Sequence, residues 1–152
     1  MKRKIISIIL ASTLIFSTSI LAMASNNSNN IVDTEYFDNG YYTETIITEI
    51  DDGSKASKSG TKRTSYYNNG TLLWYVQVNG SFTYNGSSST CTSSTVTAAS
   101  NNSAWKISSK SASKTGNIAK ATATAKQYIL GVCIQTITRN VSLTCNNNGV
   151  LS

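Results

Sequence analysis

Hydrophobic and polar positions alternate most regularly in residues 72–84. Because successive side chains of a strand point to opposite faces, a period of two predicts a half-buried strand, or two strands in line. Gly80, in the middle of the run, predicts a bulge or a bend. The even positions are Leu72, Trp74, Val76, Val78, Gly80, Phe82 and Tyr84, whereas the odd positions are polar from Gln77 onward.

Two Asn-Gly pairs predict turns on either side of this run. Asn69-Gly70 is a strong hairpin signal because both residues tolerate a positive φ, so residues 61–67 are expected to pair with residues 71–78. Asn85-Gly86 predicts a second turn, which leads into a Ser- and Thr-rich stretch.

The C-terminal half repeats the period of two. Four alanines alternate with lysine and threonine in residues 119–126, and the threonines favour a strand with every alanine on one face. Residues 132–145 place Ile137, Val141, Leu143 and Cys145 on one face of another strand. With the β-branched residues 41–50, about seven short strands predict an all-β fold, a single antiparallel β-sandwich that is immunoglobulin-like in general layout. A small open β-barrel is the alternative.

The N-terminus has the pattern of a secretory signal. Lys2, Arg3 and Lys4 precede an apolar run, and Ala22-Met23-Ala24 fits the small-x-small motif of a cleavage site. We therefore expect residues 1–24 to be a signal peptide, residues 25–35 a flexible lead-in, and residues 36–152 one domain. The mature protein is expected to be a secreted monomer without a membrane span, at most loosely associated with the cell surface.

Charge is divided sharply along the chain. Three of the 13 Lys and Arg residues belong to the expected signal, so ten bases and seven acids remain in residues 25–152, a net charge of +3. All seven acids lie between Asp33 and Asp52, and all ten bases follow residue 53. An acidic strand segment (36–52) thus precedes a basic body (53–152). Either the acidic segment offsets the self-repulsion of the body, or it tunes the attraction of the body to anionic polymers.

Three cysteines in an exported chain predict one disulfide and one free thiol. Cys133 and Cys145 share one expected strand and are about 40 Å apart at about 3.3 Å per residue, which is too far for a bond. The partner of Cys91 is therefore Cys145 or Cys133. We favour Cys91–Cys145, because Cys133 lies in an apolar run where a free thiol behaves as a small buried hydrophobe.

Three segments together resemble a family of short exported proteins of Gram-positive bacteria. They are YYNNGTLLWYVQVNGSFTYNGSSSTCTSS, AWKISSKSASKTGNIAKATATA and VSLTCNNNG, and the resemblance spans about residues 60–149. It implies export and a bacterial source. It transfers no active-site residue, because the family has no established function.

Few side chains of this sequence could take part in catalysis or metal binding. The chain has no histidine, and its Cys and carboxylate residues lack the spacing of a zinc site, so we expect no catalytic residue, metal or cofactor. Glu44 and Glu49 are five residues apart, which puts them on opposite faces of a regular strand and argues against a glycosidase pair. We expect a protein that is not an enzyme.

Binding is the function class that these exclusions favour. We expect a secreted module that contacts an anionic cell-envelope polymer or an extracellular protein, and no nucleic acid. The contrasting class is an antimicrobial or toxin-like effector, which the absence of amphipathic helices and exposed apolar runs disfavours. A third class is a matrix protein that pairs through its sheet edges. The candidate patch comprises Tyr66, Tyr67, Leu73 and Tyr75, on the hairpin face opposite Trp74, with Lys120 and Lys126 on the exposed side of the alanine strand.

Overall fold

The computed structural model describes residues 29–50, 53–54 and 56–152, and most of them lie in β-strands, as the alternating pattern predicted. A short 3-10 turn, η1 (Asp38–Gly40), connects the first two strands. The strands are β1 (Asn29–Tyr36), β2 (Tyr41–Ile50), β3 (Ser57–Asn68), β4 (Thr71–Tyr84), β5 (Ser89–Ser100), β6 (Trp105–Thr115), β7 (Ile118–Ile129) and β8 (Val132–Thr144).

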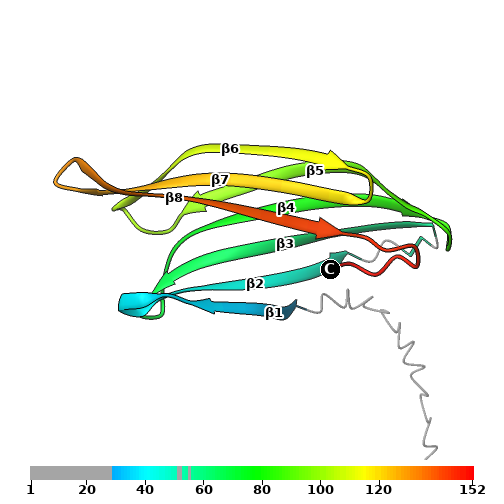
Figure 1. The fold of residues 1–152 in the computed structure, drawn as a ribbon, viewed down its shortest axis with the longest axis horizontal. Coiled ribbons are helices and arrows are strands. Elements are labelled where there is room, and N and C mark those ends of the chain that lie inside the picture. The colour runs from blue at the N-terminus through cyan, green and yellow to red at the C-terminus, as the bar shows by residue number, and fades with distance from the viewer. Residues whose placement is uncertain (1–28, 51–52, 55) are drawn as a thin grey trace, which may run out of the picture.

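The strands form two antiparallel sheets that pack face to face (Figure 1). The larger sheet has the order β1-β2-β3-β4-β5 and the smaller has the order β6-β7-β8. This arrangement confirms the predicted sandwich; the sheets are not closed into a barrel. Its likeness to an immunoglobulin domain lies in the two-sheet layout, because every strand here pairs with its sequence neighbour except at the β5–β6 crossing, whereas immunoglobulin domains use Greek-key connections.

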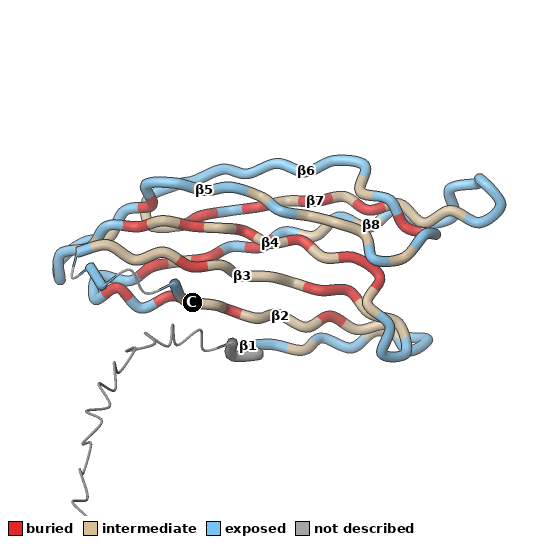
Figure 2. Tube along the Cα trace, turned by 180° about the vertical axis from the view of Figure 1, so that it is seen from behind, coloured by how far each residue is buried: buried red, intermediate tan, exposed pale blue. Residues whose placement is uncertain are grey.

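The core lies between the inner faces of the two sheets (Figure 2). From β4 it receives the predicted apolar side chains, including Trp74 and Phe82, and from β7 it receives all four alanines. β8 contributes Val141, Leu143 and Cys145, which confirms the predicted face of that strand. Small alanine side chains let β7 approach β4 closely, so the larger residues of β4 and β8 fill the space between the sheets.

Gly80 serves this close approach. A Cβ atom at Gly80 would lie 2.7 Å from the Phe82 ring and 3.0 Å from the Ala119 Cβ, so only glycine fits without movement. The bulge falls on the neighbouring strand: Ser81 pairs with Ser93 and Phe82 with Cys91, which leaves Thr92 as the extra residue of β5.

Both predicted Asn-Gly turns are confirmed, and one N-terminal expectation is wrong. Asn69 and Gly70 have φ angles of 46° and 81° and join β3 to β4. The flexible lead-in is wrong for residues 29–35, because β1 occupies them and pairs along the edge of β2, whose backbone groups it satisfies. Residues 1–28, with the expected signal peptide, lie outside the described residues. In the part of the chain that the structure describes, no helix has the length and apolar character needed to cross a membrane.

Candidate binding surfaces

The predicted aromatic patch is divided between the core and the surface. Tyr66 is 5% exposed, and its ring lies 5.9 Å from the ring of Trp74 and 5.9 Å from that of Trp105. Leu73 is buried because it is the extra residue of a bulge: Tyr66 pairs with Trp74 and Tyr67 with Leu72. The expectation that Tyr66 and Leu73 belong to an exposed patch is therefore wrong, since both are core residues.

Tyr67 lies on the outer face of the five-stranded sheet, in a row of three aromatic rings that we call the tyrosine ladder (Tyr36, Tyr42 and Tyr67). The rings of Tyr42 and Tyr67 stack at 4.9 Å with an interplanar angle of 8°, and the rings of Tyr36 and Tyr42 are 5.8 Å apart. Tyr36 and Tyr42 were not among the predicted patch residues, because the three rings are aligned only by the pairing of β1, β2 and β3, which no local sequence pattern indicated.

Tyr75, the other outward residue of the predicted patch, is covered by a cation. The guanidinium of Arg63 lies 3.7 Å from the centre of the Tyr75 ring, which is a close cation–π contact. Tyr75 is therefore half-buried under Arg63 and separate from the tyrosine ladder.

Burial and a neighbouring carboxylate change the acidity of Tyr67, the innermost member of the tyrosine ladder. Burial raises the pKa of Tyr67, and the nearby Glu44 carboxylate raises it further, both by its charge and by a hydrogen bond, while a hydrogen bond with Ser65 lowers it. Burial and the neighbouring Tyr41 likewise raise the pKa of Tyr66, against the opposing charge of Arg139. Both phenols are thus held in the neutral form.

The outer face of the three-stranded sheet carries lysines and hydroxyl groups, and we call it the lysine–hydroxyl face. The Thr122 hydroxyl donates to Asn140 Oδ1 at 2.7 Å, and the hydroxyls of Thr124 and Thr138 are 2.9 Å apart. Because all seven acids precede residue 53, the face contains no carboxylate side chain. Its outward residues are Lys106, Ser109, Ser111, Ser113, Lys120, Thr122, Thr124, Lys126, Thr136, Thr138, Asn140 and Ser142.

Lys120 and Lys126 lie where the sequence placed them. Both alternate with the buried alanines of β7, so they project from the outer face, and Lys126 is directly opposite Lys106 of β6. Six residues of strand separate Lys120 from Lys126, or about 20 Å at 3.3 Å per residue. The structure therefore does not join these lysines to the aromatic residues of the predicted patch, which belong to the other sheet.

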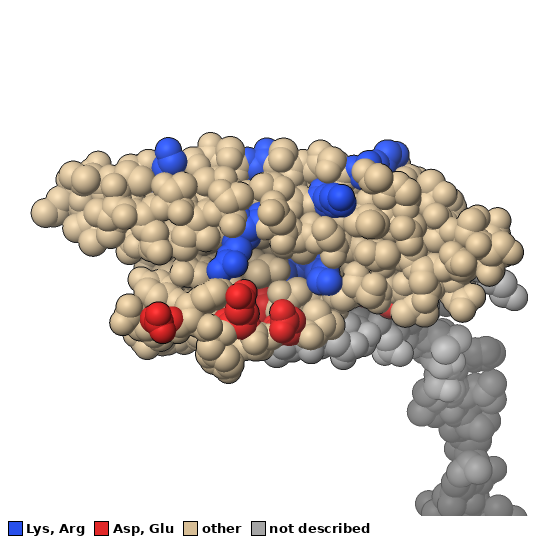
Figure 3. Space-filling view, viewed as in Figure 1, with Lys and Arg blue, Asp and Glu red and all other residues tan. Residues whose placement is uncertain are grey.

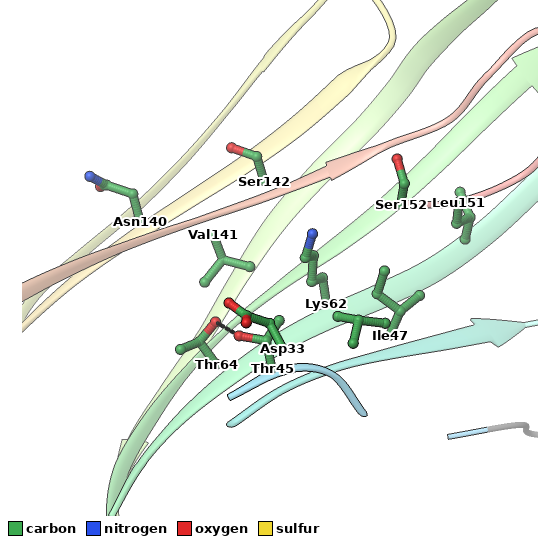
Figure 4. A pocket seen from close by; sticks show the side chains of 11 residues that line it. Asp33, Thr45, Ile47, Lys62, Thr64, Asn140, Val141, Ser142, Leu151 and Ser152 are labelled. Atoms are coloured by element: carbon green, nitrogen blue, oxygen red, sulfur yellow. Dashed lines mark hydrogen bonds between the residues drawn. The ribbon is translucent and has the colours of Figure 1, made fainter. Parts of the chain in front are cut away.

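A groove of 590 Å³ opens between the edge strand β8 and the inner face of β1, β2 and β3 (Figure 4). The side chains of Asp33 and Lys62 enter it, and the hydroxyls of Thr45 and Thr64 are 2.9 Å apart on its floor. Ser152 lies at its mouth and exchanges two backbone hydrogen bonds of 2.9 Å with Thr144. The groove therefore combines a cation, a carboxylate and hydroxyls in an open polar surface.

Charges of opposite sign meet along this side of the molecule (Figure 3). The Glu49 carboxylate lies 2.8 Å from the Lys58 ammonium, and the Glu35 carboxylate lies 3.8 Å from the Arg139 guanidinium. The second pair joins β1 to β8 and so connects the two sheets. The acidic strands therefore lie against the basic body rather than apart from it.

The structure has all three cysteines as free thiols, so the predicted Cys91–Cys145 bond is not formed. Cys91 and Cys145 are both buried beside the β6–β7 turn, where their backbone N–H groups donate to Gly116 and Asn117. The thiols are directed to different acceptors, because Cys91 donates to the Ser93 carbonyl and Cys145 to the Asn146 carbonyl. Burial raises the pKa of Cys91, and the neighbouring Cys145 adds to this increase. Cys133 is exposed, which corrects the expectation that it is buried.

The described residues include few clusters of side chains that could act in catalysis or bind a metal. Glu44 pairs with Ser65 on the outer face, whereas Glu49 pairs with Gly60 on the inner face, so the two carboxylates point to opposite sides of β2 as predicted. Among the described residues, no three His, Cys, Asp or Glu side chains come together in a way that could hold a metal ion. Comparison of the chain with protein-family models, with curated proteins and with solved structures finds no match.

Proposed function

We propose that this protein is a secreted, non-catalytic binding module that contacts anionic polymers of the bacterial cell envelope. The observation that carries the proposal is the lysine–hydroxyl face, a broad outer surface with ammonium groups near both ends and hydroxyl and amide groups between them. Lysines attract the charges of an anionic polymer, and the hydroxyls can donate to and accept from its oxygens.

The test is binding to purified Gram-positive cell walls and to isolated polyglycerol phosphate. Protein comprising residues 25–152 should bind at low salt, and binding should weaken steeply from about 10 to 150 mM salt, as the Debye length falls from about 30 to 8 Å. Replacing both Lys120 and Lys126 with serine should weaken binding several-fold and reduce its salt dependence by roughly two charge contacts.

The matched control removes the same charge from other surfaces. Lys62 lies in the groove, and Lys110 is opposite Ala123 and therefore on the inner side of β6. The Lys62→Ser/Lys110→Ser variant should retain most of the binding. Equal losses in the two double variants would assign binding to net charge and contradict a role for the lysine–hydroxyl face.

The proposal includes export and a disulfide formed in an oxidising compartment. Export rests on the N-terminal residues 1–24 and on the resemblance to exported Gram-positive proteins.

Cys91 and Cys145 are buried neighbours, so oxidation should link them and close a long loop. In the chain-entropy model, closing this loop contributes roughly 4 kcal/mol to the free energy of unfolding. Mass spectrometry of the non-reduced exported protein should find this linked peptide, with Cys133 as the free thiol. A link that contains Cys133 would refute the pairing.

A further inference from the structure

The β7–β8 hairpin ends in an exposed apolar tip, which we define as residues 128–134 and call the hairpin tip (Figures 1 and 2). Leu130 is 100% exposed and Val132 is 64% exposed, and Ile129 and Ile134 are each more than half exposed. No charged residue lies between Lys126 and Arg139. The expectation that exposed apolar runs are missing is therefore wrong for this hairpin.

The hairpin tip is exposed because it extends beyond the rest of its sheet. β6 begins at Trp105, opposite Gln127, and the Tyr128 N–H donates to the Ala104 carbonyl at 2.7 Å, so residues 129–134 form a two-stranded projection. Tyr128 pairs with Cys133 and Ile129 with Val132, and successive pairs face opposite sides. Apolar groups thus occupy both sides of the projection.

Leucine is an energetically unfavourable residue at position 130. It has a φ of 51° in the turn, a conformation that Asn and Gly adopt more readily than Leu, and its whole side chain meets solvent. The position therefore combines backbone strain with full exposure of a large aliphatic group. A site that accepts both is expected to use the apolar side chain.

A tyrosine and two lysines lie at the base of the hairpin tip. Lys106 Nζ is 5.4 Å from the centre of the Tyr128 ring, and Lys106 is directly opposite Lys126 on the same face. Like charges at directly opposite positions destabilise a sheet, and an anion between them relieves that repulsion. This order of groups matches an anionic membrane interface. The apolar end would meet the acyl chains, the aromatic ring the interfacial layer, and the two lysines the anionic headgroups.

We propose that the hairpin tip inserts into the interfacial layer of an anionic lipid membrane, with Leu130 deepest and Lys106 and Lys126 at the headgroups. A lipid surface fits better than a protein pocket because the tip is convex and apolar on both sides. In this two-stranded hairpin only the backbone groups between β7 and β8 are paired, so the outward N–H and C=O groups need water, which confines the tip to the hydrated interfacial layer. This lipid contact is a second activity that shares Lys106 and Lys126 with the lysine–hydroxyl face, and Leu130→Asp distinguishes it from polymer binding because the substitution removes no lysine.

The test measures cosedimentation of residues 25–152 with two kinds of vesicle, one of phosphatidylcholine alone and one of equal parts phosphatidylcholine and phosphatidylglycerol. The protein should bind the anionic vesicles and bind the neutral ones poorly. Leu130→Asp should lower binding to anionic vesicles about tenfold, because it removes the inserted side chain and adds a charge. Val150→Asp is the matched control, since Val150 is also exposed (55%), and it should change binding by less than about twofold.

A fluorescent label gives an independent measurement. Cys133 is the exposed cysteine, whereas Cys91 and Cys145 are buried, so an environment-sensitive dye can be attached within the tip of the native protein. Its emission should shift to the blue on anionic vesicles, and Leu130→Asp should abolish the shift. Equal binding to neutral vesicles, an unchanged dye signal, or a dimer in solution that Leu130→Asp dissociates would overturn the proposal, the last by assigning the tip to a second copy of the chain.

Discussion

Trp74 joins the two sheets through aromatic contacts. It is 1% exposed, and its ring lies 5.9 Å from that of Tyr66 and 6.4 Å from that of Trp105, which begins β6. Trp74→Ala should lower the free energy of unfolding by about 3–5 kcal/mol, because it removes a large buried side chain and leaves a cavity. Denaturant unfolding monitored by circular dichroism measures the loss.

Tyr75→Ala is the matched comparison on the opposite face of β4. Tyr75 is half-buried, and its main partner is the Arg63 guanidinium, so its removal should cost about 1 kcal/mol. Equal losses for Trp74→Ala and Tyr75→Ala would show that both faces of β4 are packed alike, contrary to the observed burial.

At the same scale, single residues explain where the sequence pattern failed. The period of two correctly predicted that Trp74, Val76, Val78 and Phe82 face the core, because burial of one face requires alternation. It misplaced Leu73, since one extra residue at a bulge turns the next side chain to the other face. The role of Gly80 depends on Ala119, nearly forty positions away and in the other sheet, a contact that the local pattern does not contain.

At the scale of elements, strand pairing was predictable where a turn determined it. Asn69-Gly70 identified the β3–β4 hairpin because its φ angles suit the turn. β1 is polar and is recognisable only from its pairing with β2, so it was mistaken for a flexible segment even though Asn39-Gly40, with φ angles of 60° and 75°, leads from it into β2. The tyrosine ladder was missed for the same reason, because it requires the registers of three strands at once.

Two tyrosines with raised pKa values, Tyr66 in the core and Tyr67 in the tyrosine ladder, predict a loss of stability at alkaline pH. The folded protein raises the pKa of Tyr66 and Tyr67 above the value of about 10 for an unfolded tyrosine. The unfolded chain therefore loses these protons first, and the free energy of unfolding should be unaffected below about pH 10 and fall as the pH rises through the folded pKa values. Denaturant unfolding at a series of alkaline pH values measures this decrease.

Glu44→Gln isolates one cause of the shift. It removes the carboxylate whose charge and hydrogen bond raise the pKa of Tyr67, so the tyrosinate absorbance of the variant should develop at lower pH than that of the parent protein. Glu49→Gln is the control, because Glu49 lies on the other face and pairs with Lys58. An alkaline titration that Glu44→Gln leaves unchanged would contradict this account of Tyr67.

At the scale of the whole molecule, the division of charge has two separable consequences. The ion pairs of Glu35 with Arg139 and of Glu49 with Lys58 hold acidic strands against basic ones. Each exposed ion pair of this kind contributes at most about 1 kcal/mol to the free energy of unfolding, so Glu35→Gln should lower stability only slightly. The other consequence acts over distance, because exposed acids reduce the positive potential that an anionic polymer meets.

Neutralising exposed acids tests this long-range effect. Asp51 and Asp52 lie outside the described residues, so Asp33 and Asp38, both exposed, are the better choices. Asp33→Asn/Asp38→Asn raises the net charge of residues 25–152 from +3 to +5. It should tighten binding to cell walls at about 10 mM salt and have little effect near 150 mM, where screening limits the interaction to about 8 Å. Asp33→Glu/Asp38→Glu keeps the charge and should bind like the parent protein. If the Asn variant binds no more tightly at low salt, the acids do not tune polymer binding, and their contribution is confined to holding β1 and β2 against the basic body.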